Sequence, residues 1–308
     1  MKVSFGIINY NRLFYLKSCA ESLMKSIEGY DNIELICIDD NSKEKGTKEY
    51  LKTLEDRGWL IINQEDYRKK PKQEIGIVKQ LIDEYSAALN IFYEKSNGDI
   101  IAPLQGDMQF IRKDWLKEYI TLFEERDDVF AAMFDAQRRI RLESNEFEKI
   151  QISNAVFGVN PSRIIPGAGD CFYIRKILDI LGGWKVGQEI NAEDMFTIMG
   201  NQVFSGKKRV FVPWVPASVA IYTDPRGTMG RVRGNTRYGV YWEALDNNLY
   251  YKWIDQDRIK SFEHRPLSIE EVAIANGDWE LPIDKSGNWK KNPINWPYEK
   301  NVPHEVIY

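Results

Sequence analysis

The chain has 308 residues, 43% of them hydrophobic, which is enough for one large domain or for one domain with an appendage. Its 42 basic and 46 acidic residues give a formal charge of −4, so composition favours neither nucleic acid nor membrane surfaces as partners. The three cysteines lack metal-ligand spacing, and their odd number indicates a reducing compartment rather than a disulfide framework. Only two histidines occur, both near the end, which argues against zinc hydrolases and Ser/His/Asp enzymes. No apolar run approaches the roughly 20 residues of a membrane helix, so we expect a soluble, cytoplasmic protein without a transmembrane segment.

The first part of the chain alternates between apolar runs and helical patterns. Continuous apolar runs at Val3–Ile8, Ile33–Ile38 and Trp59–Ile62 are typical of strands buried on both faces. The first run is too short for a signal peptide. Between these runs, Leu13–Ile27 and Lys48–Arg57 carry apolar residues at helical spacing. The alternation predicts a parallel sheet wound as in nucleotide-binding proteins.

A fourth predicted strand leads into a candidate ligand site. The basic loop Tyr67–Gln73 and a long helical pattern over Glu74–Ser96 precede the apolar run Ile100–Leu104. This run enters a polar turn that holds Asp107. Open α/β sheets bind ligands just past the carboxyl ends of their strands. A carboxylate at that position can hold a divalent cation against a phosphate.

The second half of the chain carries weaker patterns. We expect helices at Trp115–Glu125 with Asp114 as N-cap, at Arg175–Leu181 and at Glu193–Phe204, and strands at Val129–Phe134, Ile164–Ile174 and Val210–Val212. The composition shifts after about Pro216, where a Gly/Arg-rich stretch precedes an irregular tail rich in Trp and Pro.

Four short motifs occur in order along these elements. They are Asn9-Tyr10-Asn11-Arg12, Asp39-Asp40-Asn41-Ser42, Gln105-Gly106-Asp107, and Gly182-Gly183-Trp184 followed by Glu193-Asp194. With these motifs the chain resembles the inverting family 2 glycosyltransferases over about residues 3–213. The resemblance implies a GT-A fold, an α/β architecture with a mixed, mostly parallel sheet flanked by helices, followed here by a C-terminal extension.

The resemblance also implies a donor site for a nucleotide-diphosphate sugar, with a UDP-sugar favoured. Its expected residues are Ile8, Asn9, Tyr10, Arg12, Asp39, Asp40, Gln105, Gly106 and Asp107. Asp40 corresponds to the residue that reads the base, and Asp107 to the metal ligand. Mn²⁺ or Mg²⁺ suits an oxygen-only site and would neutralise the charge that builds up on the leaving nucleoside diphosphate.

Inverting displacement also needs a general base for the acceptor hydroxyl. The resemblance assigns this role to Asp194, with Glu193 as the alternate. The competing interpretation is that both carboxylates only complement the dipole at the start of a helix. Gly169, Asp170 and Trp184 are the expected acceptor contacts, although Trp184 can equally belong to the core.

The sequence departs from the family pattern at two positions. Gln105 replaces the first acid of the usual Asp-x-Asp motif, and Leu89 replaces the Arg that often precedes the residue matched by Asn90. Some relatives add a late histidine as a metal ligand, which the Gly/Arg-rich stretch of this chain lacks. The expected cations for the diphosphate are therefore Lys79, Arg231 and Arg233.

We expect a glycosyltransferase domain over residues 1–215, with a nucleotide-binding half at about 1–112 and an acceptor half at about 113–215. Residues 216–308 are expected to add a flexible Gly/Arg loop, helices and an irregular tail packed on the core. The Gly/Arg loop either closes over the diphosphate or is a solvated connection.

The expected activity is metal-dependent sugar transfer to a hydroxyl acceptor such as a glycan or a glycoconjugate. One alternative is a transferase acting on a modified base in DNA, which the arginines of the Gly/Arg loop favour and the net charge disfavours. Another is a catalytically inactive scaffold that binds a nucleotide sugar, which Gln105 favours. A nucleotidyltransferase is disfavoured because no glycine-rich loop follows the first strand.

Overall fold

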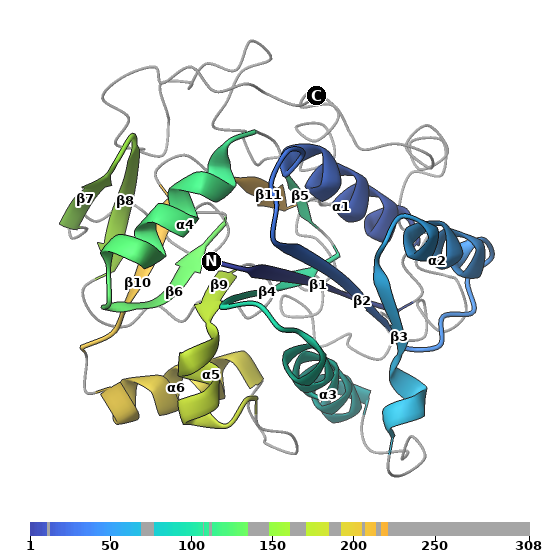
Figure 1. Cartoon of the computed structure of the whole chain (residues 1–308). Coiled ribbons are helices and arrows are strands. Elements are labelled where there is room, and N and C mark those ends of the chain that lie inside the picture. Colours follow the sequence, from blue (N-terminus) through green and yellow to red (C-terminus); the bar gives the residue numbers. More distant parts are fainter. Residues whose placement is uncertain are drawn as a thin grey trace, which may run out of the picture.

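The computed structural model of the chain is shown in Figure 1. It describes residues 1–10, 13–68, 77–106, 108–110, 113–134, 148–160, 171–184, 192–204, 207–213 and 217–220. Within these ranges, no helix is both long and apolar enough to cross a membrane.

A nine-stranded mixed sheet forms the centre of the fold, in the order β3-β2-β1-β4-β9-β6-β10-β8-β7. Its strands are β1 (Val3–Asn9), β2 (Ile33–Asp39), β3 (Leu60–Asn63), β4 (Ile100–Gln105), β6 (Val129–Met133), β7 (Glu148–Ile152), β8 (Ala155–Asn160), β9 (Cys171–Ile174) and β10 (Arg209–Pro213). The first four strands are mutually parallel, and β10 is parallel to β6. β9 is antiparallel to β4 and β6, and β8 is antiparallel to β10 and β7. The expected mixed, mostly parallel sheet is confirmed.

Helices cover both faces of this sheet (Figure 1). One face packs against α1 (Leu13–Ser26), α2 (Thr47–Asp56) and α4 (Trp115–Glu125), and the other against α3 (Ile77–Lys95), α5 (Arg175–Leu181) and α6 (Ala192–Phe204). Because side chains alternate along a strand, Phe5 of β1 faces the first group of helices. Its neighbour Gly6 meets Phe92 of α3 on the other side, and a Cβ on Gly6 would lie 2.4 Å from the Phe92 ring. This glycine therefore lets α3 pack directly on the central strand.

A small second sheet lies beside α1. It pairs β5 (Met108–Phe110) with β11 (Ser218–Ala220) in antiparallel register. The buried Ser18 hydroxyl of α1 donates to Gln109 Oε1 at 3.0 Å, and the Phe110 amide donates to Ser22 Oγ at 3.1 Å. Buried polar groups are stable when they are paired in this way, so these bonds fix β5 against α1.

Several sequence-based boundaries need correction. The sequence did not predict β5, β7, β8 or β11. The strand expected from Ile164 is described only over Cys171–Ile174, and residues 164–170 lie outside the described ranges. Asp114 does occupy the N-cap position of α4, but its side chain makes no cap hydrogen bond. Capping residues usually have extended backbone, whereas Asp114 is left-handed with φ 62°.

Candidate functional site

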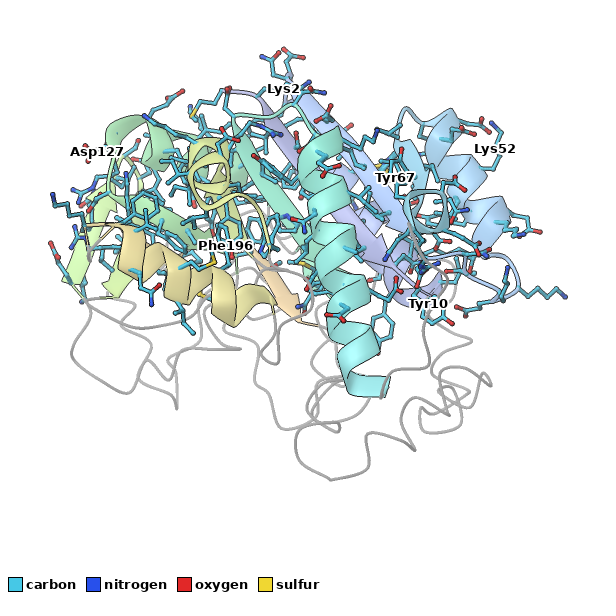
Figure 2. The ribbon with its side chains drawn as sticks, turned by 90° about the horizontal axis from the view of Figure 1, so that it is seen from below. Lys2, Tyr10, Lys52, Tyr67, Asp127 and Phe196 are labelled. Atoms are coloured by element: carbon cyan, nitrogen blue, oxygen red, sulfur yellow. The ribbon has the colours of Figure 1, made fainter. Side chains whose placement is uncertain are left out.

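The expected donor-site residues follow neighbouring parallel strands, whose carboxyl ends meet at one edge of the sheet. In the strand register, Ile8 of β1 lies opposite both Ile38 of β2 and Gln105 of β4, and Asn9 lies opposite Asp39. Figure 2 shows Tyr10, just after β1, at the edge of the sheet opposite to Lys2. We call the edge near Tyr10 the carboxyl edge and the edge near Lys2 the amino edge.

Asp39 joins the ends of β1 and β2. Its Oδ1 accepts from Asn9 Nδ2 at 2.7 Å and from the Ser42 hydroxyl at 2.6 Å, and its Oδ2 accepts from the Ser42 amide at 2.9 Å. The three donors satisfy a carboxylate that is only 6% exposed. Asp39 therefore shapes the turn after β2.

Asp40 lies beside a cation that sequence analysis assigned only to a basic loop. The Arg68 guanidinium is hydrogen-bonded to Asp40 Oδ1 through Nη2. Arg68 also donates to Glu84 Oε2 of α3, from Nε at 3.1 Å and from Nη2 at 2.8 Å. Gln64 Nε2 donates to the same carboxylate oxygen at 2.8 Å. These bonds connect the end of β2, the segment after β3 and α3.

Electrostatics hold Arg68 in its charged form. Burial disfavours the guanidinium charge, but the hydrogen bonds to Glu84 and Asp40 outweigh it and raise the pKa of Arg68. Arg68 and Asp40 are separated by 28 residues in sequence, and neither lies in a periodic pattern that would pair them. The one signal available to sequence analysis was a basic loop directly after a strand end.

The Gln105–Asp107 turn leads from β4 to β5. Gln105 ends β4 opposite Ile8, and Gly106 lies against α1, where an added Cβ would be 3.8 Å from Tyr15 Cβ. Asp107 lies outside the described residues, between Gly106 and Met108. Among the residues that the structure does describe, no group of three or more His, Cys, Asp or Glu side chains could hold a metal ion. The metal site at Asp107 stays a prediction.

The expected catalytic acids Glu193 and Asp194 fall in the first turn of α6. Trp184, in the turn after α5, is 2% exposed. Its ring stacks on Phe196 of α6 with centroids 5.2 Å apart, and meets Tyr173 of β9 edge-on at 6.0 Å. Trp184 is thus part of the core in this conformation, and its contact with an acceptor stays a prediction.

The remaining predicted residues are placed only in part. Lys79 lies in the first turn of α3. Arg12, Gly169, Asp170, Arg231 and Arg233 lie outside the described residues. The structure therefore brings together the strand-end set of β1, β2 and β4, adds Arg68 to it, and leaves the other expected contacts untested.

Comparison with known proteins points to one family. Residues 4–149 match the sequence profile of Glycosyl transferase family 2. This segment contains the strand ends described above together with Arg68, Glu84 and Asn90. No curated protein sequence matches the chain.

Similar solved structures include S. aureus TarS, with 17% identity and a TM-score of 0.49 over 69% of this chain and 35% of that chain. A second is S. aureus TarS 1-349 in complex with UDP-GlcNAc, with 18% identity and a TM-score of 0.46 over 69% of this chain and 56% of that chain. A third is mannosyltransferase PcManGT from Pyrobaculum calidifontis in complex with GDP-Man and Mn²⁺, with 14% identity and a TM-score of 0.46 over 68% of this chain and 56% of that chain. The matched region is thus 35% to 56% of the length of these three structures.

Proposed function

We propose that this chain, which belongs to glycosyl transferase family 2 through residues 4–149, transfers a sugar from a nucleotide-diphosphate sugar to a hydroxyl acceptor. The observation that carries the proposal is the Asp40–Arg68 pair at the carboxyl edge, inside the family segment. This edge is where sheets of this kind bind nucleotides.

The charges of this pair favour uracil as the base. Uracil presents one N–H donor flanked by two carbonyl oxygens. The Asp40 carboxylate can accept from the N–H, while the adjacent Arg68 guanidinium donates to a carbonyl oxygen. Guanine presents two neighbouring N–H donors, which a carboxylate alone can bind. An adjacent guanidinium therefore contributes less to the recognition of guanine than to that of uracil. The pair therefore supports a UDP-sugar over a GDP-sugar as donor.

The diphosphate is the second element of the proposed donor site. We assign Asp107 as the metal ligand and Gln105 as its neighbour, because oxygen donors suit Mn²⁺ or Mg²⁺. When bound, such an ion supplies positive charge against the leaving nucleoside diphosphate. Lys79, Arg231 and Arg233 remain the proposed alternative cations.

Residues of α6 complete the proposed reaction. Asp194, or alternatively Glu193, removes the proton from the acceptor hydroxyl as this oxygen attacks the anomeric carbon. The bond from that carbon to the diphosphate breaks, and the configuration inverts. Residues 1–215 form the proposed transferase domain. Beyond residue 215, β11 at Ser218–Ala220 pairs with β5. The proposed acceptor is a glycan or a glycoconjugate.

A thermal-shift panel of UDP-, GDP- and dTDP-sugars, with and without Mn²⁺, tests the donor assignment. Ligands that bind only the native state raise Tm by mass action, so a UDP-sugar with Mn²⁺ should give the largest shift. Release of UDP from the best donor should then fall sharply in Asp194→Asn while UDP binding persists. Binding without turnover by the wild type would instead identify a non-catalytic scaffold.

A further inference from the structure

Asn90 of α3 clamps the backbone of Trp184, which lies 94 residues further along the chain. Its Nδ2 donates to the Trp184 carbonyl at 2.7 Å, and its Oδ1 accepts from the Trp184 amide at 2.8 Å. One side-chain amide thereby pairs with both backbone polar groups of Trp184, as a neighbouring strand would do. Both backbone groups are therefore paired within the protein, which holds the turn against α3.

The turn itself is shaped to meet Asn90. Gly182 ends α5 in the left-handed region with φ 71°, and Gly183 follows with φ 72°. A Cβ on Gly183 would lie 2.6 Å from Asn90 Oδ1, which is closer than real Cβ contacts come. The two glycines therefore allow the backbone both to reverse and to approach the amide of Asn90.

Aromatic packing connects Trp184 to α6. The Trp184 ring stacks on Phe196 with an interplanar angle of 28°. Phe196 is 1% exposed and also meets Tyr173 of β9 at 5.4 Å. Since Phe196 lies two residues after Asp194, the Trp184 ring contacts the same helical turn that carries the proposed base.

Other contacts already attach α5 to α3 without Asn90. Arg175 Nη2 donates to the Ser96 carbonyl at 2.6 Å, and the Tyr93 hydroxyl donates to Asp179 of α5. These bonds hold α5 itself, whereas Asn90 acts on the turn that follows it. Asn90 thus supplies two hydrogen bonds from α3 to the turn that follows α5.

We propose that Asn90 is a positioning residue for the acceptor-side carboxylates Glu193 and Asp194, acting through Trp184 and Phe196. The inference rests on the proposed function and assigns Asn90 a role through its hydrogen bonds to Trp184. Small displacements of a catalytic group lower the rate of the chemical step more than they lower substrate affinity. Loss of the clamp should therefore reduce kcat and spare donor binding.

The test compares Asn90→Ala with Tyr93→Phe, a matched control that removes another α3–α5 hydrogen bond. Asn90→Ala should lower kcat for UDP release from the best donor by about 10- to 100-fold, with donor KM and UDP Kd unchanged within about twofold. Tyr93→Phe should leave all three near wild type. Asn90→Asp, whose carboxylate accepts from the Trp184 amide but cannot donate to its carbonyl, should be intermediate.

Amide hydrogen exchange provides a readout that does not depend on turnover. Asn90→Ala should speed exchange in the first turns of α6, and Tyr93→Phe should not. Unchanged exchange in α6, or parallel losses in kcat and UDP affinity, would overturn the inference. A wild-type protein that binds donor but releases no UDP would refute the proposed reaction, and the exchange result would then still decide whether Asn90 controls α6.

Discussion

Strands β1 and β2 carry a polar network at each end, and the two networks differ in where their partners come from. At the amino edge, Glu34 Oε2 accepts from the Ser4 hydroxyl at 2.5 Å and from the Asn97 amide at 2.7 Å. The Gly98 amide donates to Ser4 Oγ at 2.8 Å, and Lys2 lies 3.6 Å from the same carboxylate. Every partner is close to β1, β2 or the turn before β4.

At the carboxyl edge, Asp39 has a comparable structural role with Asn9 and Ser42. The network there extends one residue further, to Asp40, whose partner Arg68 is brought in from the segment after β3. An ion pair between two side chains can be exchanged for a ligand that offers the same hydrogen bonds. Hydrogen-bonded carboxylates stabilise the sheet at the amino edge, and we propose that the same chemistry recognises a base at the carboxyl edge.

Changes at the proposed metal ligand should have the largest effect on donor binding. Asp107→Ala should abolish the metal-dependent part of donor binding, a loss of about 100-fold or more, because the remaining ligand set lacks a carboxylate. Gln105→Asp should preserve or tighten metal-dependent binding, since it adds an acidic oxygen ligand. Isothermal titration of the donor with and without Mn²⁺ checks both variants. Unchanged metal dependence in Asp107→Ala would contradict the assignment.

Substitution of Asp40 should have the second-largest effect on donor binding. Asp40→Asn removes the charge that pairs with Arg68 and that we propose accepts from the base, so UDP affinity should fall by about 10- to 100-fold. Glu34→Gln, the matched change at the amino edge, should leave UDP affinity unchanged. Titration calorimetry of both variants with UDP checks this contrast, and equal losses in the two would remove the functional distinction between the edges.

Glu34→Gln should instead reduce stability. The variant weakens the hydrogen bonds from Ser4 and Asn97 to a charged acceptor, so the free energy of unfolding should fall by about 1–2 kcal/mol. Urea denaturation measures this change. A variant as stable as the wild type would show that the amino-edge network does not support the sheet.

Acidification should give the smallest effect, confined to low pH. Burial opposes ionisation of Glu34, but the hydrogen bonds from Ser4 and Asn97 outweigh it and lower its pKa. Burial likewise opposes ionisation of Asp128, whose pKa is lowered by hydrogen bonds from Arg126 and Arg209. Because both pKa values are lower in the folded state, their stabilisation is complete above the unfolded values of about 4 and is lost as pH falls through the folded values.

The urea midpoint should therefore be flat near pH 6 and fall below about pH 4. Asp128→Asn should make the fall in the urea midpoint smaller, because the contribution of Asp128 is removed. A midpoint that rises on acidification would contradict the direction of both pKa shifts.

Sequence patterns located the parts of the fold that depend on local chemistry. The buried strands β1, β2 and β4 were predictable from continuous apolar runs, and the end of α5 from Gly182-Gly183. The edge strand β7 was missed because its alternation of polar and apolar residues is short and follows a charged stretch. β5 was missed because three residues are too few to show a period.

The candidate site was predictable where motifs mark strand ends, as at Asn9, Asp39 and Asp40. The pairing of Asp40 with Arg68 and of Asn90 with Trp184 was not, since each joins residues that only the tertiary fold brings together. For the second pairing, the sequence offered only the observation that Asn90 is a polar residue on a mostly apolar helix face.

Hydrogen exchange with and without UDP is the sharpest test of a nucleotide site at the carboxyl edge, because it compares both edges in one experiment. UDP should slow exchange at residues 40–46 and 64–68 of the carboxyl edge and leave residues 28–32 and 96–99 of the amino edge unchanged. Protection confined to the amino edge, or no protection at saturating UDP, would contradict a nucleotide site at Asp40 and Arg68.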